Sequence, residues 1–293
     1  MTVVKERAYA KINLYLDVLG IRDDGFHEIK TVMHTVSLAD EITVSVSPSK
    51  TLLIKLFIDG NHFLPTDSKN LVYRAAEMFF ERLGICADVR IKLVKNIPVA
   101  AGLAGGSSDA AATLRALNKI YKRPFSTSAL LKMAATLGSD VPYCLLGKTA
   151  VCEGRGERIT KIPTGLKMNI LIANSGEHVS TPEAYKQLDE QYSYFDGSVR
   201  NVGEEKFSSL LDMLSTGKFN DNAFYNIFEE PVLSKCPRSM LLKEKLVSLG
   251  SECVMMSGSG PSVFAVFSDN TTAEMAKDSL VLDGFCAWCT QTV

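Results

Sequence analysis

One stretch of the chain reads Ile97-Pro-Val-Ala-Ala-Gly-Leu-Ala-Gly-Gly-Ser-Ser108 and continues as Asp109-Ala-Ala-Ala-Thr-Leu-Arg-Ala-Leu117. A loop rich in glycine and alanine is thus followed by a run with apolar residues at helical spacing. Ser107 and Ser108 are residue types that favour the N-cap of a helix. A helix N-terminus binds anions through its unpaired N–H groups and the positive end of its dipole. The stretch therefore predicts a phosphate-binding loop at the start of a helix.

Two common nucleotide motifs do not match this loop. It lacks the Gly-Lys-Ser/Thr ending of the Walker A motif and the first Gly-x-Gly pair of the dinucleotide fingerprint. The alternative interpretation is a flexible glycine hinge ahead of a core helix. Pro98 stiffens the entry to the loop, and the two serines stand where phosphate ligands are expected, so the sequence favours phosphate binding.

Composition excludes several classes of protein. The 293 residues, 46% of them hydrophobic, suffice for one large domain or two ordinary ones. The net charge of −1 gives no basic surface for nucleic acid or membrane, and we expect neither as a partner. The apolar run Val263–Phe267 is far shorter than the roughly 20 residues of a membrane-spanning helix. The N-terminus has no apolar signal segment, so we expect a cytoplasmic protein.

The seven cysteines are scattered along the chain, and we expect them to be reduced and buried. Cys286-Ala-Trp-Cys289 has the spacing of zinc and redox sites, but no second pair of ligands accompanies it. A C-terminal strand would point the two thiols to opposite faces. We therefore interpret the pair as structural and expect no metal ligands there.

The pattern of apolar residues predicts alternating strands and helices. Residues Arg7–Val18 alternate as a strand, with Lys11 and Asn13 side by side on its polar face. The expected strands are Arg7–Val18, Glu41–Ser47, Leu52–Ile58, Val89–Leu93, Asn169–Ala173, Val254–Met256, Val263–Phe267 and Phe285–Thr290. The expected helices are Asn70–Leu83, the run after the glycine loop, Ser128–Leu137, a helix opening at Ser180–Glu183, Glu204–Leu214, Met240–Leu249 and Ala273–Leu282. Gly147–Gly156 is expected to be a turn, and the whole predicts an α+β sandwich with a largely antiparallel sheet.

Several motifs together resemble those of the GHMP small-molecule kinases. They are Ala10-Lys-Ile-Asn-Leu14, Asp24-Gly-Phe-His-Glu28, the glycine loop, Leu137-Gly-Ser-Asp-Val-Pro142 and Ser257-Gly-Ser-Gly260. The resemblance covers essentially the whole chain. It implies an N-terminal ATP-binding domain of the ribosomal-protein-S5-like type, residues 1–160, and a C-terminal ferredoxin-like domain, residues 161–293, with the active site at their interface.

The resemblance also implies an activity, an ATP-dependent phosphorylation of an alcohol with Mg²⁺ as the metal cofactor. The first two motifs point to CDP-methylerythritol as the acceptor, phosphorylated on its 2-hydroxyl in the non-mevalonate isoprenoid pathway. Rival interpretations are another kinase of the family, acting on homoserine or mevalonate, and a nucleotide-binding protein without catalysis. The Asp24–Glu28 motif argues against the first rival, because such acceptors carry no base. The oligomeric state stays open.

By the same resemblance, residues are assigned to three roles. Lys11 and Asp140 are the catalytic pair, the carboxylate taking the proton of the acceptor hydroxyl and the ammonium neutralising charge. The substrate-binding residues are Asn13, Phe26, His27, Thr181 and Tyr185, with Phe26 and Tyr185 stacking on cytosine and His27 supplying hydrogen bonds. The cofactor-binding residues are Pro98, Val99, Ala100, Ala101, Gly102, Leu103, Ala104, Gly105, Gly106, Ser107 and Ser108, with Asn70 and Lys95 near the adenosine.

Each assignment has a structural alternative in the sequence itself. Lys11 alone would be a solvated strand lysine, and Asp140 alone would be a helix cap ahead of Pro142. Tyr185 could be a half-buried helix residue, and Ser257–Gly260 could be a plain hairpin turn. Ala104 stands where relatives often have glycine, which costs little unless the backbone there is left-handed.

Overall fold

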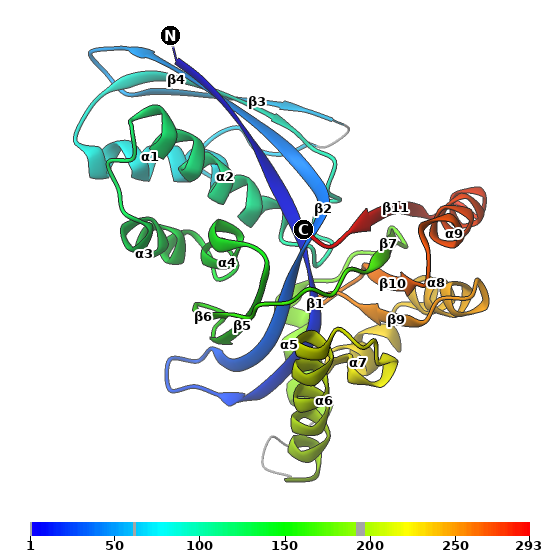
Figure 1. Cartoon of the computed structure of the whole chain (residues 1–293). Helices are drawn as coiled ribbons and strands as arrows, with labels where there is room; N and C mark the ends of the chain where they lie inside the picture. The colour runs from blue at the N-terminus through cyan, green and yellow to red at the C-terminus, as the bar shows by residue number, and fades with distance from the viewer. Residues whose placement is uncertain (1, 61–62, 192–196) are drawn as a thin grey trace. The chain divides into compact units, whose positions relative to one another are not determined.

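The computed structural model describes residues 2–60, 63–191 and 197–293. The chain divides into two compact units. The first unit comprises Met1–Ala10, Ala39–Val99 and Ala104–Gly147, and the second comprises Lys11–Leu38, Ala100–Leu103 and Lys148–Val293. Both units are discontinuous in the sequence, because the long strands β1 (Thr2–Ile21) and β2 (His27–Pro48) contribute to each (Figure 1). The expected boundary at residue 160 stays a prediction.

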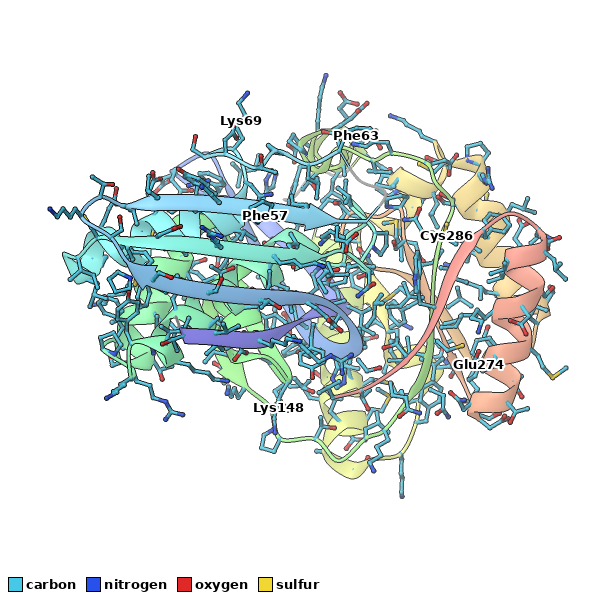
Figure 2. The ribbon with its side chains drawn as sticks, turned by 90° about the horizontal axis from the view of Figure 1, so that it is seen from above. Phe57, Phe63, Lys69, Lys148, Glu274 and Cys286 are labelled. Atoms are coloured by element: carbon cyan, nitrogen blue, oxygen red, sulfur yellow. The ribbon has the colours of Figure 1, made fainter. Side chains whose placement is uncertain are left out.

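The first unit is a sheet with helices on one side. Strands β3 (Leu53–Asp59) and β4 (Ala87–Val94) pair in parallel, and β4 pairs antiparallel with β2, so that Thr43 lies opposite Lys92. Helices α1 (Leu71–Leu83) and α2 (Gly105–Ile120) lie against one face of these strands (Figure 1). Helices α3 (Thr127–Leu137) and α4 (Val141–Leu146) follow them. Phe57 of β3 stands on the opposite, exposed face (Figure 2).

Helix α1 shows how local sequence sets the ends of an element. The Asn70 side chain accepts a hydrogen bond from the N–H of Val72 at 2.9 Å, and Gly84 ends the helix in a left-handed conformation with φ of 70°. The expected boundaries are confirmed. Ala75 and Phe79 are buried, and so are Val72, Ala76 and Phe80, because α1 contacts α2, α3 and β3 together.

The second unit contains a fully antiparallel four-stranded sheet in the order β11-β7-β10-β9, as the sequence predicts. Its strands are β7 (Asn169–Asn174), β9 (Cys253–Met256), β10 (Val263–Phe267) and β11 (Cys286–Gln291). Its helices are α5 (Thr181–Gln191), α6 (Gly197–Thr216), η1 (Asp221–Ala223), α7 (Glu229–Leu233), α8 (Pro237–Ser248) and α9 (Asn270–Leu282). The short strand β8 (Tyr225–Asn226) pairs in parallel with β1.

The expected turn at Gly147–Gly156 is wrong. Residues Thr149–Gly154 form strand β5, which pairs with β2 on one side and with β6 (Arg158–Lys161) on the other. The apolar run Ala150–Cys152 is short, and glycine and charged residues flank it, so its β character emerges only through pairing with β2. Helix α4, which follows Asp140 directly, has no counterpart among the predicted helices.

The cysteines are less buried than expected. Cys144, Cys152 and Cys236 are buried, whereas Cys86 and Cys286 are exposed, the latter at the start of β11 (Figure 2). All seven lie in the described part of the chain, and none forms a disulfide. Along those same residues no helix is both long and apolar enough to cross a membrane.

A buried ion cluster fixes the entry to the glycine loop in the first unit. The Lys95 ammonium, with a side chain 3% exposed, donates to carboxylate oxygens of Asp40 on β2 and Asp109 on α2. The other oxygen of Asp40 accepts from the N–H groups of Asn96 and Ile97 at 2.6 and 2.8 Å. The cluster therefore ties the end of β4, the first residues of the loop and helix α2 to one another.

This cluster holds two carboxylates against one ammonium. Burial opposes the charged form of Lys95, but the two carboxylates outweigh burial and raise its pKa. Burial and the neighbouring Asp40 raise the pKa of Asp109 to about 8 against the opposing effect of Lys95. The second oxygen of Asp109 is buried without a hydrogen-bond partner, which is consistent with a carboxyl that keeps its proton.

A close approach between two backbone segments organises the second unit. Gly102 has φ of 73°, and a Cβ at this position would lie 2.1 Å from the carbonyl oxygen of Ser257. A Cβ on Gly258 would lie 3.1 Å from the carbonyl oxygen of Gly102. The Ser257 hydroxyl donates to that same oxygen at 3.1 Å. Glycine at position 102 is therefore required by both the backbone angle and the space.

We expect Gly102→Ala to lower the free energy of unfolding by at least about 2 kcal/mol. The alanine would have to adopt a left-handed conformation, and its Cβ would clash with the carbonyl oxygen of Ser257. Gly165→Ala is the matched control, since nothing lies within 4 Å of its added Cβ, and a change within about 0.5 kcal/mol is expected there. Urea denaturation measures both. Equal stability of the two variants would show that Gly102 and Ser257 are not in close contact.

The ion cluster predicts a pH dependence with a defined sign. A raised pKa means that folded Asp109 keeps a proton that the unfolded chain loses, so this contribution to stability falls as pH rises from about 4 to about 8. Asp109→Asn removes the contribution. The unfolding free energy of this variant relative to wild type should therefore increase from pH 5 to pH 8, by up to about 1.4 kcal/mol per pH unit. Asp23→Asn, at an exposed turn, is the control and should run parallel to wild type.

Candidate active site

Lys11 is buried, which overturns its interpretation as a solvated strand lysine. The residue is 5% exposed, and its ammonium donates to the Asn13 side-chain oxygen at 2.7 Å and to the Gly102 carbonyl at 2.8 Å. This face of β1 is covered, because the glycine loop packs on it and brings the Gly102 carbonyl to the Lys11 ammonium. The side-chain oxygen of Asn13 and the carbonyl oxygen of Gly102 thus hold the Lys11 ammonium in one position.

Asn13 supports Lys11 and is in turn held in place. Its amide nitrogen donates to the Thr31 hydroxyl at 2.8 Å, and that hydroxyl donates to the backbone oxygen of Tyr15. Asn13 is 2% exposed. The predicted juxtaposition of Lys11 and Asn13 is confirmed, and the side-chain oxygen of Asn13 serves to orient the ammonium.

The glycine loop carries an unusual backbone. Ala100, Gly102 and Ala104 all have positive φ, of 53°, 73° and 55°. Alternate left-handed residues turn backbone N–H groups toward one side, which is the arrangement of anion-binding nests. Ala104 is in the left-handed conformation, in which an alanine is strained by about 1–2 kcal/mol. Alanine in place of glycine is therefore costly at this position. Strain of this kind is found where a backbone conformation serves a site.

The prediction that Ser107 and Ser108 cap the helix is wrong. Helix α2 begins at Gly105, with Ala104 at the N-cap and no side-chain capping bond, so both serines lie inside its first turn. The Ser108 hydroxyl is buried and donates to the Tyr9 backbone oxygen at 2.7 Å. Glycine at position 105 permits the close approach of Lys95, whose ammonium would lie 3.2 Å from a Cβ there.

Asn70 and Lys95, predicted to lie near the adenosine, both have structural partners. The Asn70 amide caps α1 and donates to the Pro65 backbone oxygen at 2.8 Å. The Lys95 ammonium is enclosed by Asp40 and Asp109, as described above. A contact of these two residues with a nucleotide stays a prediction.

Asp140 lies in the first unit, at the residue before α4. Its side chain makes no capping hydrogen bond to the helix, although its backbone oxygen accepts from the N–H of Cys144 at 3.0 Å. The residue is partly exposed. Asp140 thus stands at the N-cap position of α4, as its interpretation as a helix cap expects, but its carboxylate makes no capping bond, and a catalytic role for it stays a prediction.

The structure brings His27 and Tyr185 together. Their rings are stacked, with centroids 4.4 Å apart and planes at 28°. Phe228 contacts the Tyr185 ring edge-on at 4.8 Å. The Nε2 atom of His27 lies 2.9 Å from a carboxylate oxygen of Asp189 on α5. Sequence reasoning missed Asp189, although its spacing of four residues from Tyr185 places both on one face of a helix.

Phe26 contacts Arg155, whereas Tyr185 contacts His27. The Arg155 guanidinium lies 4.1 Å above the centre of the Phe26 ring, which is 51% exposed. The turn that carries Phe26 is held by ion pairs from Arg22 to Asp24 and to Glu28, at 3.2 and 2.7 Å. Hydrogen bonds to Arg22 lower the pKa of Asp24, so the turn keeps its charge to low pH. The pairing of Phe26 with Tyr185 around a base stays a prediction.

Thr181 and the turn Ser257–Gly260 also lie together, because the Thr181 hydroxyl is 2.9 Å from that of Ser259. Asn226, which the sequence did not single out, holds this turn from behind. Its amide nitrogen donates to the backbone oxygens of Met256 and Gly258 at 2.7 and 2.9 Å. The turn is therefore more than a plain hairpin, since it is fixed by β8 and packed against Gly102.

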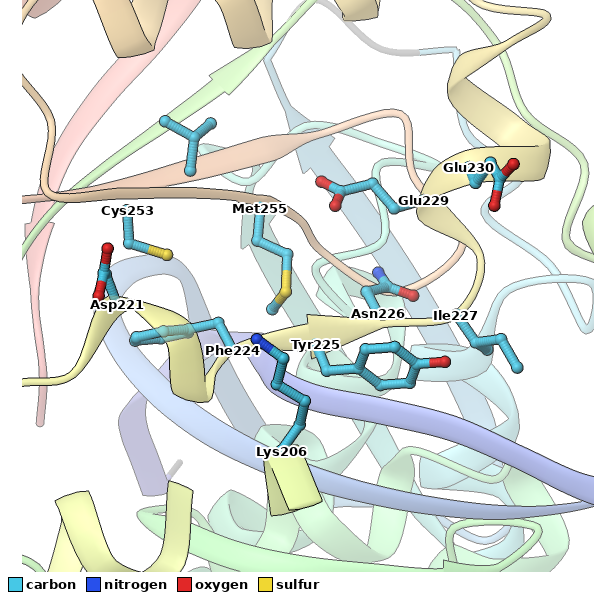
Figure 3. Close-up of a pocket in the computed structure, with 11 residues that line it drawn as sticks. Lys206, Asp221, Phe224, Tyr225, Asn226, Ile227, Glu229, Glu230, Cys253 and Met255 are labelled. Atoms are coloured by element: carbon cyan, nitrogen blue, oxygen red, sulfur yellow. The ribbon is translucent and has the colours of Figure 1, made fainter. Parts of the chain in front are cut away.

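Asn226 also lines a cavity of about 330 Å³ (Figure 3). Its lining comes from β8, β9 and the segments around α6 and α7, and none of the predicted site residues contributes to it. Its charged groups belong to Lys206, Asp221, Glu229 and Glu230, and Glu229 pairs with Lys243 at 2.8 Å. Among the described residues, no group of three or more His, Cys, Asp or Glu side chains is placed to hold a metal ion.

Comparison with family models assigns both parts of the chain. Residues 70–148 match the model described as GHMP kinases N terminal domain, and residues 200–283 match the model described as GHMP kinases C terminal. A solved homoserine kinase from Cytophaga hutchinsonii has a TM-score of 0.79 at 20% identity, covering 100% of this chain and 95% of that one. At that identity the likeness concerns the fold alone. It confirms the α+β fold expected for the family.

Curated relatives are similar over nearly the whole length. The 4-diphosphocytidyl-2-C-methyl-D-erythritol kinase of Geobacillus sp. (strain WCH70) is 40% identical over 283 residues, which cover 96% of this chain and 93% of the relative. The enzyme of that name from Clostridium beijerinckii is also 40% identical, covering 94% and 95%. A crystal structure of a 4-(cytidine 5'-diphospho)-2C-methyl-D-erythritol kinase has a TM-score of 0.79 at 33% identity, covering 99% of both chains. This chain is therefore a phosphotransferase that belongs to the GHMP kinase family and, within it, to the 4-diphosphocytidyl-2-C-methyl-D-erythritol kinases.

Proposed function

We propose that this protein transfers the γ-phosphoryl group of ATP to the 2-hydroxyl of CDP-methylerythritol, a step of the non-mevalonate isoprenoid pathway. The observation that carries the proposal is the 40% identity to curated kinases of that name over 96% of the chain. The grouping of His27, Tyr185 and Asp189 supports it, because aromatic rings and hydrogen-bonding side chains are the groups that recognise a nucleobase. Homoserine and mevalonate contain no nucleobase, so a kinase that acts on them does not need residues that recognise one.

Phosphoryl transfer requires positioning and neutralisation of charge more than covalent chemistry. Lys11 suits the second task, since Asn13 and Gly102 hold its ammonium in place and desolvation strengthens its field. Asp140 suits the role of general base, because a partly exposed carboxylate at the start of α4 can accept the proton of the acceptor hydroxyl. The transferred proton goes to Asp140, and the phosphoryl group forms its new bond to the acceptor oxygen as the bond to the leaving ADP breaks.

The glycine loop is the proposed site of the ATP phosphates. Its left-handed residues and the N-terminus of α2 both direct backbone N–H groups at an anion. Mg²⁺ is usually held by phosphate oxygens, water and one or two protein groups, so the lack of a metal-binding cluster among the described residues is compatible with it. Ser107, in the first turn of α2, is the proposed protein ligand, and Mg²⁺ would neutralise phosphate charge there.

The test of the proposed function is an ADP-release assay with CDP-methylerythritol, homoserine and mevalonate as acceptors. We expect turnover with the first and at most trace rates with the others. CMP should inhibit more strongly than UMP, because a site that pairs with the cytosine amino group leaves polar groups unpaired beside uracil. Turnover of homoserine or mevalonate at a comparable rate would contradict the proposal.

We expect Asp140→Asn to lower kcat by roughly 10²–10⁴-fold, the usual contribution of a general base. The fold and the affinity for ATP should be unchanged, as measured by circular dichroism and calorimetry. Asp212→Asn, at an exposed position of α6, is the control and should retain wild-type turnover. A kcat within a few-fold of wild type in Asp140→Asn would exclude Asp140 as the base.

A further inference from the structure

Strands β1 and β2 carry a series of buried hydrogen bonds that ends at the Lys11 ammonium. The Thr31 hydroxyl of β2 donates to the backbone oxygen of Tyr15 and accepts from the Asn13 amide nitrogen at 2.8 Å. The Asn13 side-chain oxygen accepts in turn from Lys11 at 2.7 Å. Thr31 is fully buried and Asn13 is 2% exposed, so bulk water cannot replace a partner that either residue loses.

The two ends of the Asn13 amide differ in chemistry but hardly in shape. One end is an oxygen that accepts hydrogen bonds, and the other is an NH₂ group that donates them. If the amide were reversed, its NH₂ group would face the Lys11 ammonium, and two donors would meet. Packing does not prevent the reversal, because the two ends are nearly equal in size. The hydrogen-bond partners of the amide therefore have to fix its orientation.

Thr31 fixes this orientation through the single hydrogen of its hydroxyl. A backbone carbonyl accepts but does not donate, so the Thr31 hydrogen points to the Tyr15 oxygen. The Thr31 oxygen is then an acceptor, and it takes the NH₂ end of Asn13. The oxygen end of Asn13 is thereby turned to Lys11. Tyr15 belongs to β1, so the direction of every bond in the series starts from the backbone of a strand.

We propose that Thr31 is a positioning residue for phosphoryl transfer, which holds the Asn13 amide with its oxygen toward the Lys11 ammonium. The inference rests on the proposed function, since it concerns the lysine that would neutralise charge on the transferred group. The Gly102 carbonyl is a second acceptor for that ammonium, at 2.8 Å. A reversed Asn13 presents a donor instead, so the ammonium shifts away from its position, and catalysis depends steeply on such positions. Thr31 acts through Asn13 and does not touch the substrates.

The first experiment measures kcat and the KM for ATP in Thr31→Val, Thr31→Ala and Thr31→Ser. The first two variants lack the hydroxyl, and we expect each to lower kcat roughly tenfold, the effect of one hydrogen bond, with an unchanged KM for ATP. Thr31→Ser keeps the hydroxyl and should restore most of kcat. A wild-type kcat in a folded variant without the hydroxyl, or no rescue by serine, would overturn the proposal.

Thr149→Val is the matched control. Thr149 is also buried in a strand, at 1% exposure, and its hydroxyl lies 2.7 Å from Nδ1 of His34. The variant therefore removes a buried threonine hydroxyl with a hydrogen-bond partner, as Thr31→Val does, but the partner is not Asn13. We expect it to lower the free energy of unfolding and to leave kcat unchanged. An equal loss of kcat in both variants would mean that Thr31 has a structural role only.

The second experiment is a double-mutant cycle with Asn13→Ala. Asn13→Ala should itself lower kcat, because the Lys11 ammonium loses one of its acceptors. Since Thr31 acts through Asn13, adding Thr31→Val to Asn13→Ala should cause no further loss of kcat. Additive losses would show that Thr31 acts by another route and would contradict the proposal.

A third measurement needs no turnover. The Asn13 side-chain amide is identified in nitrogen-labelled protein by its absence from Asn13→Ala, and its exchange with deuterium should be faster in Thr31→Val than in wild type. Unchanged exchange would overturn the role of Thr31. A wild-type protein that does not phosphorylate CDP-methylerythritol would instead contradict the proposed function, so the two failures are distinguishable.

Discussion

The carbonyl oxygen of Gly102 is the point on which the organisation of the second unit depends. It accepts hydrogen bonds from the Lys11 ammonium at 2.8 Å and from the Ser257 hydroxyl at 3.1 Å. Three motifs that are far apart in the sequence thus reach one atom. A glycine is required at position 102 for the backbone angle and for the space, and Asn226 holds the opposing turn from behind. The position of the proposed catalytic lysine is therefore set by the same contacts that pack the glycine loop.

In the first unit, a cluster of buried charges fixes the position of the backbone in a similar way. Lys95 is enclosed by Asp40 and Asp109, and Asp40 also binds the N–H groups of the first two residues after Lys95. Removing one partner of such a cluster leaves an uncompensated buried charge, so the three residues act as a unit. The cluster places the beginning of the glycine loop relative to helix α2. A loop rich in glycine and alanine could not hold one conformation without such fixed ends, because its own side chains make few contacts.

Specificity for the acceptor is the property that the proposed site explains in most detail. The proposed roles of Lys11 and Asp140 require no particular acceptor, and this fold is shared with a solved homoserine kinase. The residues proposed to recognise the acceptor include His27 and Tyr185, whose rings are stacked, and the His27 ring also meets Asp189. A stacked ring gives affinity for any nucleobase, whereas hydrogen bonds to the edge of the nucleobase distinguish one from another.

Sequence alone determined the elements whose signals are local. The caps at Asn70 and Gly84, the alternation along β1 and the antiparallel sheet of the second unit follow from patterns of neighbouring residues. The motifs of Lys11, the glycine loop and the Asp24–Glu28 turn were enough to indicate a GHMP kinase. Tertiary structure decided the rest. Lys11 is buried, Ala104 is left-handed, Thr149–Gly154 is a strand and Asp189 faces His27 because of residues distant in sequence. Burial, backbone strain and side-chain pairing are properties of what surrounds a residue, and no local pattern of residues contains them.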